Sequence, residues 1–60
     1  MPPIDRIRAY EAGDLSDEDT IALFQQGIDE GWVWILQGSY GRQAERLINY
    51  GLCTPARGHA

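Results

Sequence analysis

The sequence contains no lysine, one cysteine and one histidine among its 60 residues. Because Cys53 has no partner within the chain, neither an intrachain disulfide framework nor a zinc site built on cysteines is expected. The only histidine, His59, lies beyond every predicted helix, so no Ser-His or Cys-His catalytic pair is expected. No stretch approaches the roughly 18 apolar residues of a membrane span, and the N-terminus lacks the apolar run of a signal peptide. We therefore expect a soluble cytoplasmic protein without a catalytic, cofactor or metal site.

Charge is divided unevenly along the chain. Residues 1–30 carry eight acidic residues against two arginines, a net −6, whereas residues 31–60 carry one acidic residue against three arginines, a net +2. The helix dipole favours acidic residues in a first helical turn, which accounts for the three at 17–19. The remaining excess suits a basic partner or the pairing of opposite ends of two copies. It disfavours nucleic acid, whose phosphates it would repel.

The first half of the chain carries signals for two helix starts. Pro3 is tolerated at a helix start and Gly13 is typical of a helix end, which predicts a first helix over 3–12. Ser16 is a preferred N-cap residue, and Asp19 lies where a capping box places an acidic side chain. A second helix is therefore predicted to begin at the residue after Ser16.

The end of that second helix has two interpretations. An apolar stripe keeps helical spacing well past residue 30 and consists of Ile21, Phe24, Ile28, Trp32 and Ile35. One continuous helix would run from 17 to about 36, although Gly27 and Gly31 would each cost about 1 kcal/mol relative to alanine. We favour a break near Gly31, with a helix over 17–30 and a short helix over 32–37.

A last helix is predicted over 39–50. Ser39 is expected to be its N-cap, and Gly51 is expected to end it in the left-handed conformation. In that case Leu52 lies where the Schellman motif places an apolar contact back onto Leu47.

These helices predict an all-α mini-domain of three to four short helices over residues 1–53, followed by a flexible tail over 54–60. The first helix would turn Ile4, Ile7 and Tyr10 inward. The predicted core consists of Ile7, Ile21, Phe24, Ile28, Trp32, Ile35, Ala44, Leu47 and Ile48. Without a disulfide or a metal, a domain of this size is marginally stable, which favours self-association or a partner.

The run of five apolar residues at 32–36 is the strongest functional indication. If Trp32 and Ile35 face the core, Val33 and Trp34 face elsewhere, and a continuous helix would place Trp34 beside Leu23. Exposed tryptophan is a frequent binding anchor. The alternative, that the whole run is buried among the other helices, is equally compatible with the sequence.

The last helix offers a second surface. Arg42, Arg46 and Asn49 share one face, and with Tyr40 they could read DNA as a recognition helix does. The glycines that flank Ser39 and Tyr40 could also expose backbone N–H groups, which Arg42 would complete as a phosphate site. The alternative is that the glycine-flanked segment is only a tight turn and that the arginines lie on a solvent-exposed helix face.

The string Leu36–Arg42, Leu-Gln-Gly-Ser-Tyr-Gly-Arg, resembles a family of small tailed-bacteriophage proteins of unassigned activity. Similar residues at 15–18 before it, and at Leu47 and Gly51 after it, extend the resemblance over about 10–53. The resemblance implies a phage product that acts in the host cytoplasm.

We therefore expect a phage accessory protein that binds a host or phage protein, and also itself, through an apolar surface and an acidic face. The predicted partner-binding residues are Leu23, Val33, Trp34, Tyr40, Arg42 and Arg46. A helix-turn-helix DNA-binding regulator and a minor structural component of the virion are the alternatives.

Overall fold

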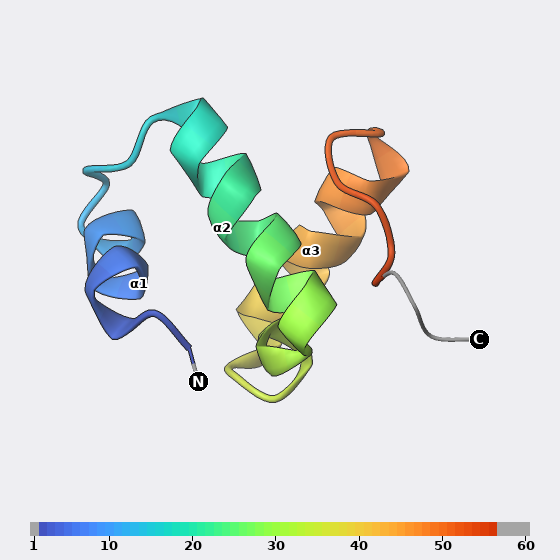
Figure 1. Ribbon diagram of the computed structural model, residues 1–60, viewed down its shortest axis with the longest axis horizontal. Helices are drawn as coiled ribbons and strands as arrows, with labels where there is room; N and C mark the ends of the chain where they lie inside the picture. The colour runs from blue at the N-terminus through green and yellow to red at the C-terminus, as the bar shows by residue number, and fades with distance from the viewer. Residues whose placement is uncertain (1, 57–60) are drawn as a thin grey trace.

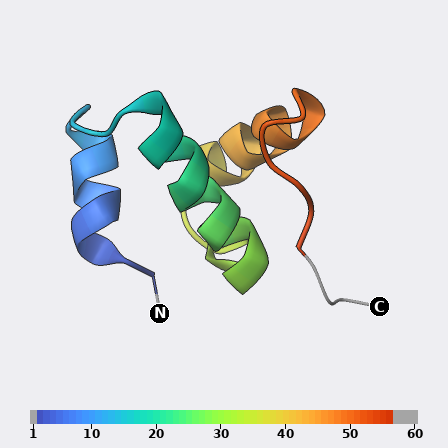
Figure 2. The same cartoon turned by 45° about the horizontal axis from the view of Figure 1, so that its top comes forward.

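The computed structural model describes residues 2–56. In this range the chain forms three α-helices, α1 (Ile4–Glu11), α2 (Asp17–Glu30) and α3 (Gly38–Asn49), with a 3₁₀ turn, η1 (Trp32–Trp34), between α2 and α3. Figure 1 shows α1 to one side of the central α2, while α3 crosses behind α2 and extends away on the other side. Figure 2 shows the same arrangement after a rotation. Residues 2–56 contain no strand, so the predicted all-α mini-domain is confirmed.

The two long helices begin in different ways. At α2 the Ser16 hydroxyl accepts a hydrogen bond from the Asp19 N–H at 3.1 Å, as predicted. At α3 the prediction of Ser39 as N-cap was wrong, because the helix begins at Gly38 and its N-cap is Gln37, which makes no side-chain capping bond. The Tyr40 N–H donates to the Gln37 carbonyl at 2.9 Å, so Ser39 already lies inside the first turn.

The break after α2 is confirmed. Gly31 has φ +88°, in the left-handed region that a side chain disfavours, and its N–H donates the last helical bond to the Gly27 carbonyl at 2.8 Å. A single helix over 17–36 is therefore wrong. The short helix predicted over 32–37 is reduced to η1, in which the Ile35 N–H donates to the Trp32 carbonyl at 3.2 Å.

The end of α3 follows the Schellman pattern. Gly51 has φ +79°, its N–H donates to the Ile48 carbonyl at 3.0 Å, and the Leu52 N–H donates to the Leu47 carbonyl at 2.9 Å. Leu47 and Leu52 also line one shallow apolar hollow. Gly51 therefore reverses the chain and directs the C-terminal segment back toward α2.

The core lies where η1 is enclosed between α2 and α3. Its buried apolar residues are Ile7, Leu23, Phe24, Ile28, Trp32, Val33, Tyr40, Ala44, Leu47 and Cys53. An aromatic group joins α1 to the other helices, because the Tyr10 ring meets those of Phe24 and Tyr40 edge-on, with centroids 5.1 and 5.9 Å away. The rings of Phe24 and Tyr40 are stacked at 5.9 Å.

Some of the predicted core positions were wrong. Ile35 is 80% exposed, because the left-handed Gly31 and the tighter 3₁₀ turn shift the phase of the apolar stripe. Ile4 is exposed at the open first turn of α1. Ile21 and Ile48 are partly buried and pack against the core from its edge.

The segment after α3 is attached to α2. The Gln25 amide nitrogen donates to the Thr54 carbonyl at 3.0 Å, and its oxygen accepts from the Thr54 N–H at 2.8 Å. Burial and the nearby Asp29 raise the pKa of the Cys53 thiol, which keeps it protonated and weakly nucleophilic. Ala56 packs against the core. The remainder of the predicted tail, 57–60, lies outside the described residues.

The described part of the chain contains neither a membrane-spanning helix nor a cluster of metal-binding side chains. None of its helices has the length and apolar character needed to cross a membrane. Across residues 2–56, no group of three or more His, Cys, Asp or Glu side chains is arranged to hold a metal ion.

Candidate partner-binding surface

Trp34 and Ile35 form an exposed apolar projection after α2, called the Trp34 corner below. Trp32 and Val33 are 3% and 0% exposed, whereas Trp34 and Ile35 are 48% and 80% exposed. The Trp34 N–H donates to the Gly31 carbonyl at 3.3 Å, which holds the corner within one turn of the end of α2. The four consecutive side chains are therefore divided, two into the core and two into solvent.

The Trp34 indole is supported on one side. A Cβ atom at Gly41 would lie 3.5 Å from Trp34 Cε3 and 3.7 Å from the Val33 carbonyl oxygen. The six-membered ring thus rests on α3 at a position where there is no side chain. This support limits the rotamers of Trp34, so binding through it would lose little conformational entropy.

Two acidic side chains lie at the end of α2, the helix that precedes the Trp34 corner. Asp29 and Glu30 occupy its last turn, which contains no basic residue, so both oppose the helix dipole. The Glu30 carboxylate accepts from the Trp32 indole N–H at 3.1 Å and from the Gln26 amide at 3.2 Å. Both acidic residues remain exposed. The Trp34 corner therefore follows a helix end that carries two exposed carboxylates.

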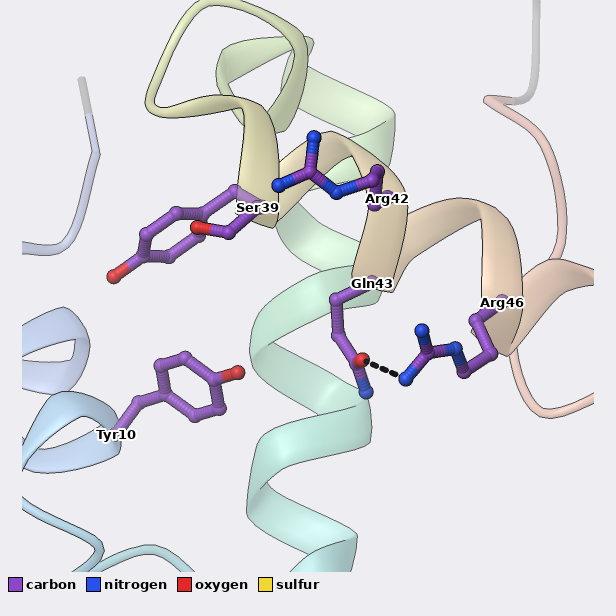
Figure 3. Close-up of a pocket in the computed structure, with 6 residues that line it drawn as sticks. Tyr10, Ser39, Arg42, Gln43 and Arg46 are labelled. Carbon is purple, nitrogen blue, oxygen red and sulfur yellow. Dashed lines mark hydrogen bonds between the residues drawn. The ribbon is translucent and has the colours of Figure 1, made fainter.

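A second candidate surface is a polar hollow of about 240 Å³ between α1 and α3, called the arginine hollow below. Its lining residues are Tyr10, Ser39, Tyr40, Arg42, Gln43 and Arg46. Figure 3 shows Arg42 and Arg46 on α3, with Gln43 between them and Tyr10 approaching from α1. The Arg46 guanidinium donates to the Gln43 amide oxygen at 3.5 Å, at the long limit for a hydrogen bond.

Tyr40 is a structural residue at the edge of this hollow. It is 6% exposed, and its hydroxyl donates to the Glu11 carboxylate at 2.6 Å. Burial, followed by this bond and the charge of Glu11, raises the pKa of the Tyr40 hydroxyl well above its usual value. The hydroxyl stays neutral and connects α3 to α1.

The predicted binding residues are divided between core and surface. Leu23, Val33 and Tyr40 are buried, so their prediction as exposed contact residues was wrong. Val33 is buried because α2 and η1 pack together at Gly27, where the absence of a side chain lets Val33 and Trp32 approach the helix. Tyr40 packs instead against the rings of Tyr10 and Phe24. A partner cannot reach these side chains while the domain is folded.

Three predicted binding residues remain accessible. Trp34, Arg42 and Arg46 are exposed. Trp34 rests on Gly41, whereas the two arginines line the arginine hollow, so they belong to two candidate surfaces rather than one. Ile35 is a further surface residue, which the predicted apolar stripe had placed in the core. Gly31 could have indicated this exposure. A helix that ends at Gly31 no longer keeps the helical spacing that placed Ile35 on the inner face.

One protein-family model matches the chain. It is described as a domain of unknown function (DUF7417), and the match covers residues 4–59. No curated protein and no solved structure matches the sequence. The match includes α1, α2, η1 and α3 in full.

Proposed function

The chain belongs to the DUF7417 family, a domain of unknown function, and we propose that it acts by binding another protein through the Trp34 corner. The observation that carries this proposal is the exposure of Trp34 and Ile35, at 48% and 80%, beside a fully buried Val33. Tryptophan is enriched among the residues that dominate binding energy. A small domain that leaves two adjacent large apolar side chains in solvent has an apolar surface available to a partner.

The chemistry of the corner defines the partner. Trp34 and Ile35 require an apolar pocket, and the exposed carboxylate of Glu30, at the end of the helix that precedes them, favours lysine or arginine near that pocket. The net −6 of residues 1–30 would also steer the approach of a basic protein. We propose a phage accessory protein of the host cytoplasm, on the basis of the Leu36–Arg42 motif, with a basic host or phage protein as its partner.

The test is capture of partners by the tagged full chain from phage-infected bacterial lysate, quantified by mass spectrometry. We expect Trp34→Ala to lose the partner that the wild type retains, with binding to the purified partner weakened about 30-fold or more. Ile35→Ala should weaken it less. Glu30→Gln should lower the association rate, mainly at low salt.

Tyr50→Ala is the matched control, because Tyr50 is another large exposed side chain, at the far end of α3. It should capture the partner as the wild type does. Circular dichroism should show the same helix content in all variants. Equal retention by Trp34→Ala and the wild type, or equal loss by Tyr50→Ala, would contradict the proposal. Sedimentation of the wild type and Trp34→Ala tests whether the partner is a second copy.

DNA binding is the second candidate, because Arg42, Arg46 and Asn49 are all exposed on α3. Asp17 counts against it, since it shares a hollow with Gln43 of the same helix and would lie close to a bound duplex. A gel shift at low salt decides between the two candidates. Salt-sensitive binding that Arg46→Ala abolishes would favour DNA, and the absence of any shift would exclude it.

A further inference from the structure

The arginine hollow is lined by hydrogen-bond donors. Arg42 and Arg46 contribute only donors, Gln43 contributes an amide nitrogen, and the hydroxyls of Tyr10 and Ser39 can donate. The Gln43 amide oxygen already accepts from Arg46, and the Tyr40 hydroxyl donates to Glu11. None of the lining residues is acidic: Glu11 is bonded to the Tyr40 hydroxyl, and Asp17 lines a different hollow, which shares Gln43 with this one. A ligand that fits this set must supply acceptors.

Without a bound anion, the two arginines destabilise α3 through charge repulsion. They lie four residues apart on α3, where like charges face each other and destabilise a helix by a few tenths of a kcal/mol. Within residues 2–56, Arg42 donates no side-chain hydrogen bond, and Arg46 donates only to a neutral amide. An anion between the two guanidiniums would convert this repulsion into attraction.

Both arginine side chains line the hollow. A Cβ atom at Gly38 would lie 3.3 Å from Arg42 Nη1, so the Arg42 side chain folds back along α3 toward the beginning of the helix. Figure 3 shows this guanidinium extending toward Ser39, while that of Arg46 extends toward Gln43. The two arginines therefore contribute donors from successive turns of α3, and Tyr10 approaches from α1.

We propose that the arginine hollow binds the oxyanion of a phosphate monoester. Its volume of about 240 Å³ lies below the roughly 300–1,000 Å³ of sites for drug-sized ligands, which suits a small anion or the phosphorylated end of a larger one. A phosphate monoester carries three acceptor oxygens and nearly two negative charges, enough for two guanidiniums and the hydroxyls. A carboxylate needs only one arginine, whose guanidinium can donate two parallel hydrogen bonds to it, so a site with two arginines fits a phosphate better. This site is separate from the Trp34 corner and does not depend on it.

The test is a titration of the isotope-labelled full chain, followed by nuclear magnetic resonance of the arginine Nε–H groups at constant ionic strength. The probes are inorganic phosphate, phosphoserine and adenosine monophosphate, with chloride as the reference. We expect saturable shifts at Arg42 and Arg46 with phosphate probes and none with chloride. The probe that binds most tightly distinguishes free phosphate, a phosphorylated side chain and a nucleotide as the source.

Variants separate a specific site from general attraction. Arg42→Ala and Arg46→Ala should each weaken phosphate binding about tenfold or more, and Arg42→Lys should weaken it less because the charge remains without the fork. Arg8→Ala is the matched control, since Arg8 is an exposed arginine on α1 outside the hollow. It should leave the affinity unchanged.

Three results would overturn the proposal. Shifts that rise linearly without saturation would indicate screening only. An equal loss of affinity in Arg8→Ala would indicate general charge attraction. Saturation by duplex DNA at the same arginines, without saturation by any monoester, would make the hollow a nucleic-acid contact.

Discussion

Trp32 and Trp34 are two residues apart on the same turn, yet one is a core residue and the other is half in solvent. Trp32 and its neighbour Val33 pack on α2, whereas Trp34 rests on α3. The Trp32 indole N–H is also bonded to Glu30. Residue type therefore does not decide the role of either tryptophan, and the helix beneath each one does.

A glycine lies beneath each tryptophan, and the two glycines differ. At Gly27 of α2 an added Cβ would clash with Val33 and lie 2.9 Å from Trp32 Cη2, closer than packed atoms allow. At Gly41 of α3 an added Cβ would lie 3.5 Å from Trp34, an ordinary contact. The buried pair thus needs its glycine for close packing, and the exposed tryptophan does not. This contrast separates the structural side of η1 from the side available to a partner.

The largest difference in stability should be that between variants of the two tryptophans. Trp32→Ala removes a buried aromatic side chain and should lower the free energy of unfolding by about 3–5 kcal/mol. A domain of this size has only about 3–9 kcal/mol in total, so much of the population should unfold. Trp34→Ala should lose about 1 kcal/mol or less. Thermal unfolding followed by circular dichroism measures both, and equal losses would show that Trp34 is as structural as Trp32.

The next effect tests the two glycines. Gly27→Ala should lower the free energy of unfolding by about 1–2 kcal/mol, because overpacking against Val33 outweighs the gain in helix propensity. Adding Val33→Ala should recover part of that loss in a double-mutant cycle. Gly41→Ala, the control, should be neutral or stabilising by up to about 1 kcal/mol. Urea unfolding measures the wild type, the two single variants and the double variant of the cycle, and Gly41→Ala. A stabilising Gly27→Ala would contradict the difference between the two glycines.

The smallest effect concerns Tyr40, which precedes Gly41 on α3 and faces the buried side. Tyr40→Phe removes the hydrogen bond to Glu11 and should cost about 1 kcal/mol at neutral pH. The pKa of Tyr40 is raised in the folded state, so its stabilising contribution is complete below the unfolded pKa of about 10 and decreases as pH rises above it. The wild type should therefore lose stability more steeply than Tyr40→Phe above that pH. Parallel curves in alkaline urea titrations would contradict this.

Much of the fold was predictable because its signals are local. The Ser16 cap, the break at Gly31 and the Schellman end at Gly51 each depend on a few neighbouring residues. The start of α3 was less predictable, because several hydrogen-bonding patterns compete at Gln37 to Ser39 and the Tyr40 bond to Gln37 decides among them.

The candidate surface was predictable only in part. Exposed Trp34 and the exposed arginines could be anticipated from the run at 32–36 and from the spacing along α3. The burial of Val33 and the exposure of Ile35 could not, because a 3₁₀ turn after a left-handed glycine follows neither the helical nor the strand period.

The sequence by itself determined the all-α class, the C-terminal ends of two helices and the charge of each half, because caps, left-handed glycines and charge act over a few residues. Only the tertiary structure decided that Val33 is buried with Trp32 and that Ile35 lies in solvent with Trp34. That choice depends on the absence of a side chain at Gly27, which lets η1 approach α2 until Trp32 and Val33 are buried and leaves Trp34 to rest on α3. Packing between residues on different elements makes this division, whereas helical spacing predicted a buried Trp32 but also predicted a buried Ile35.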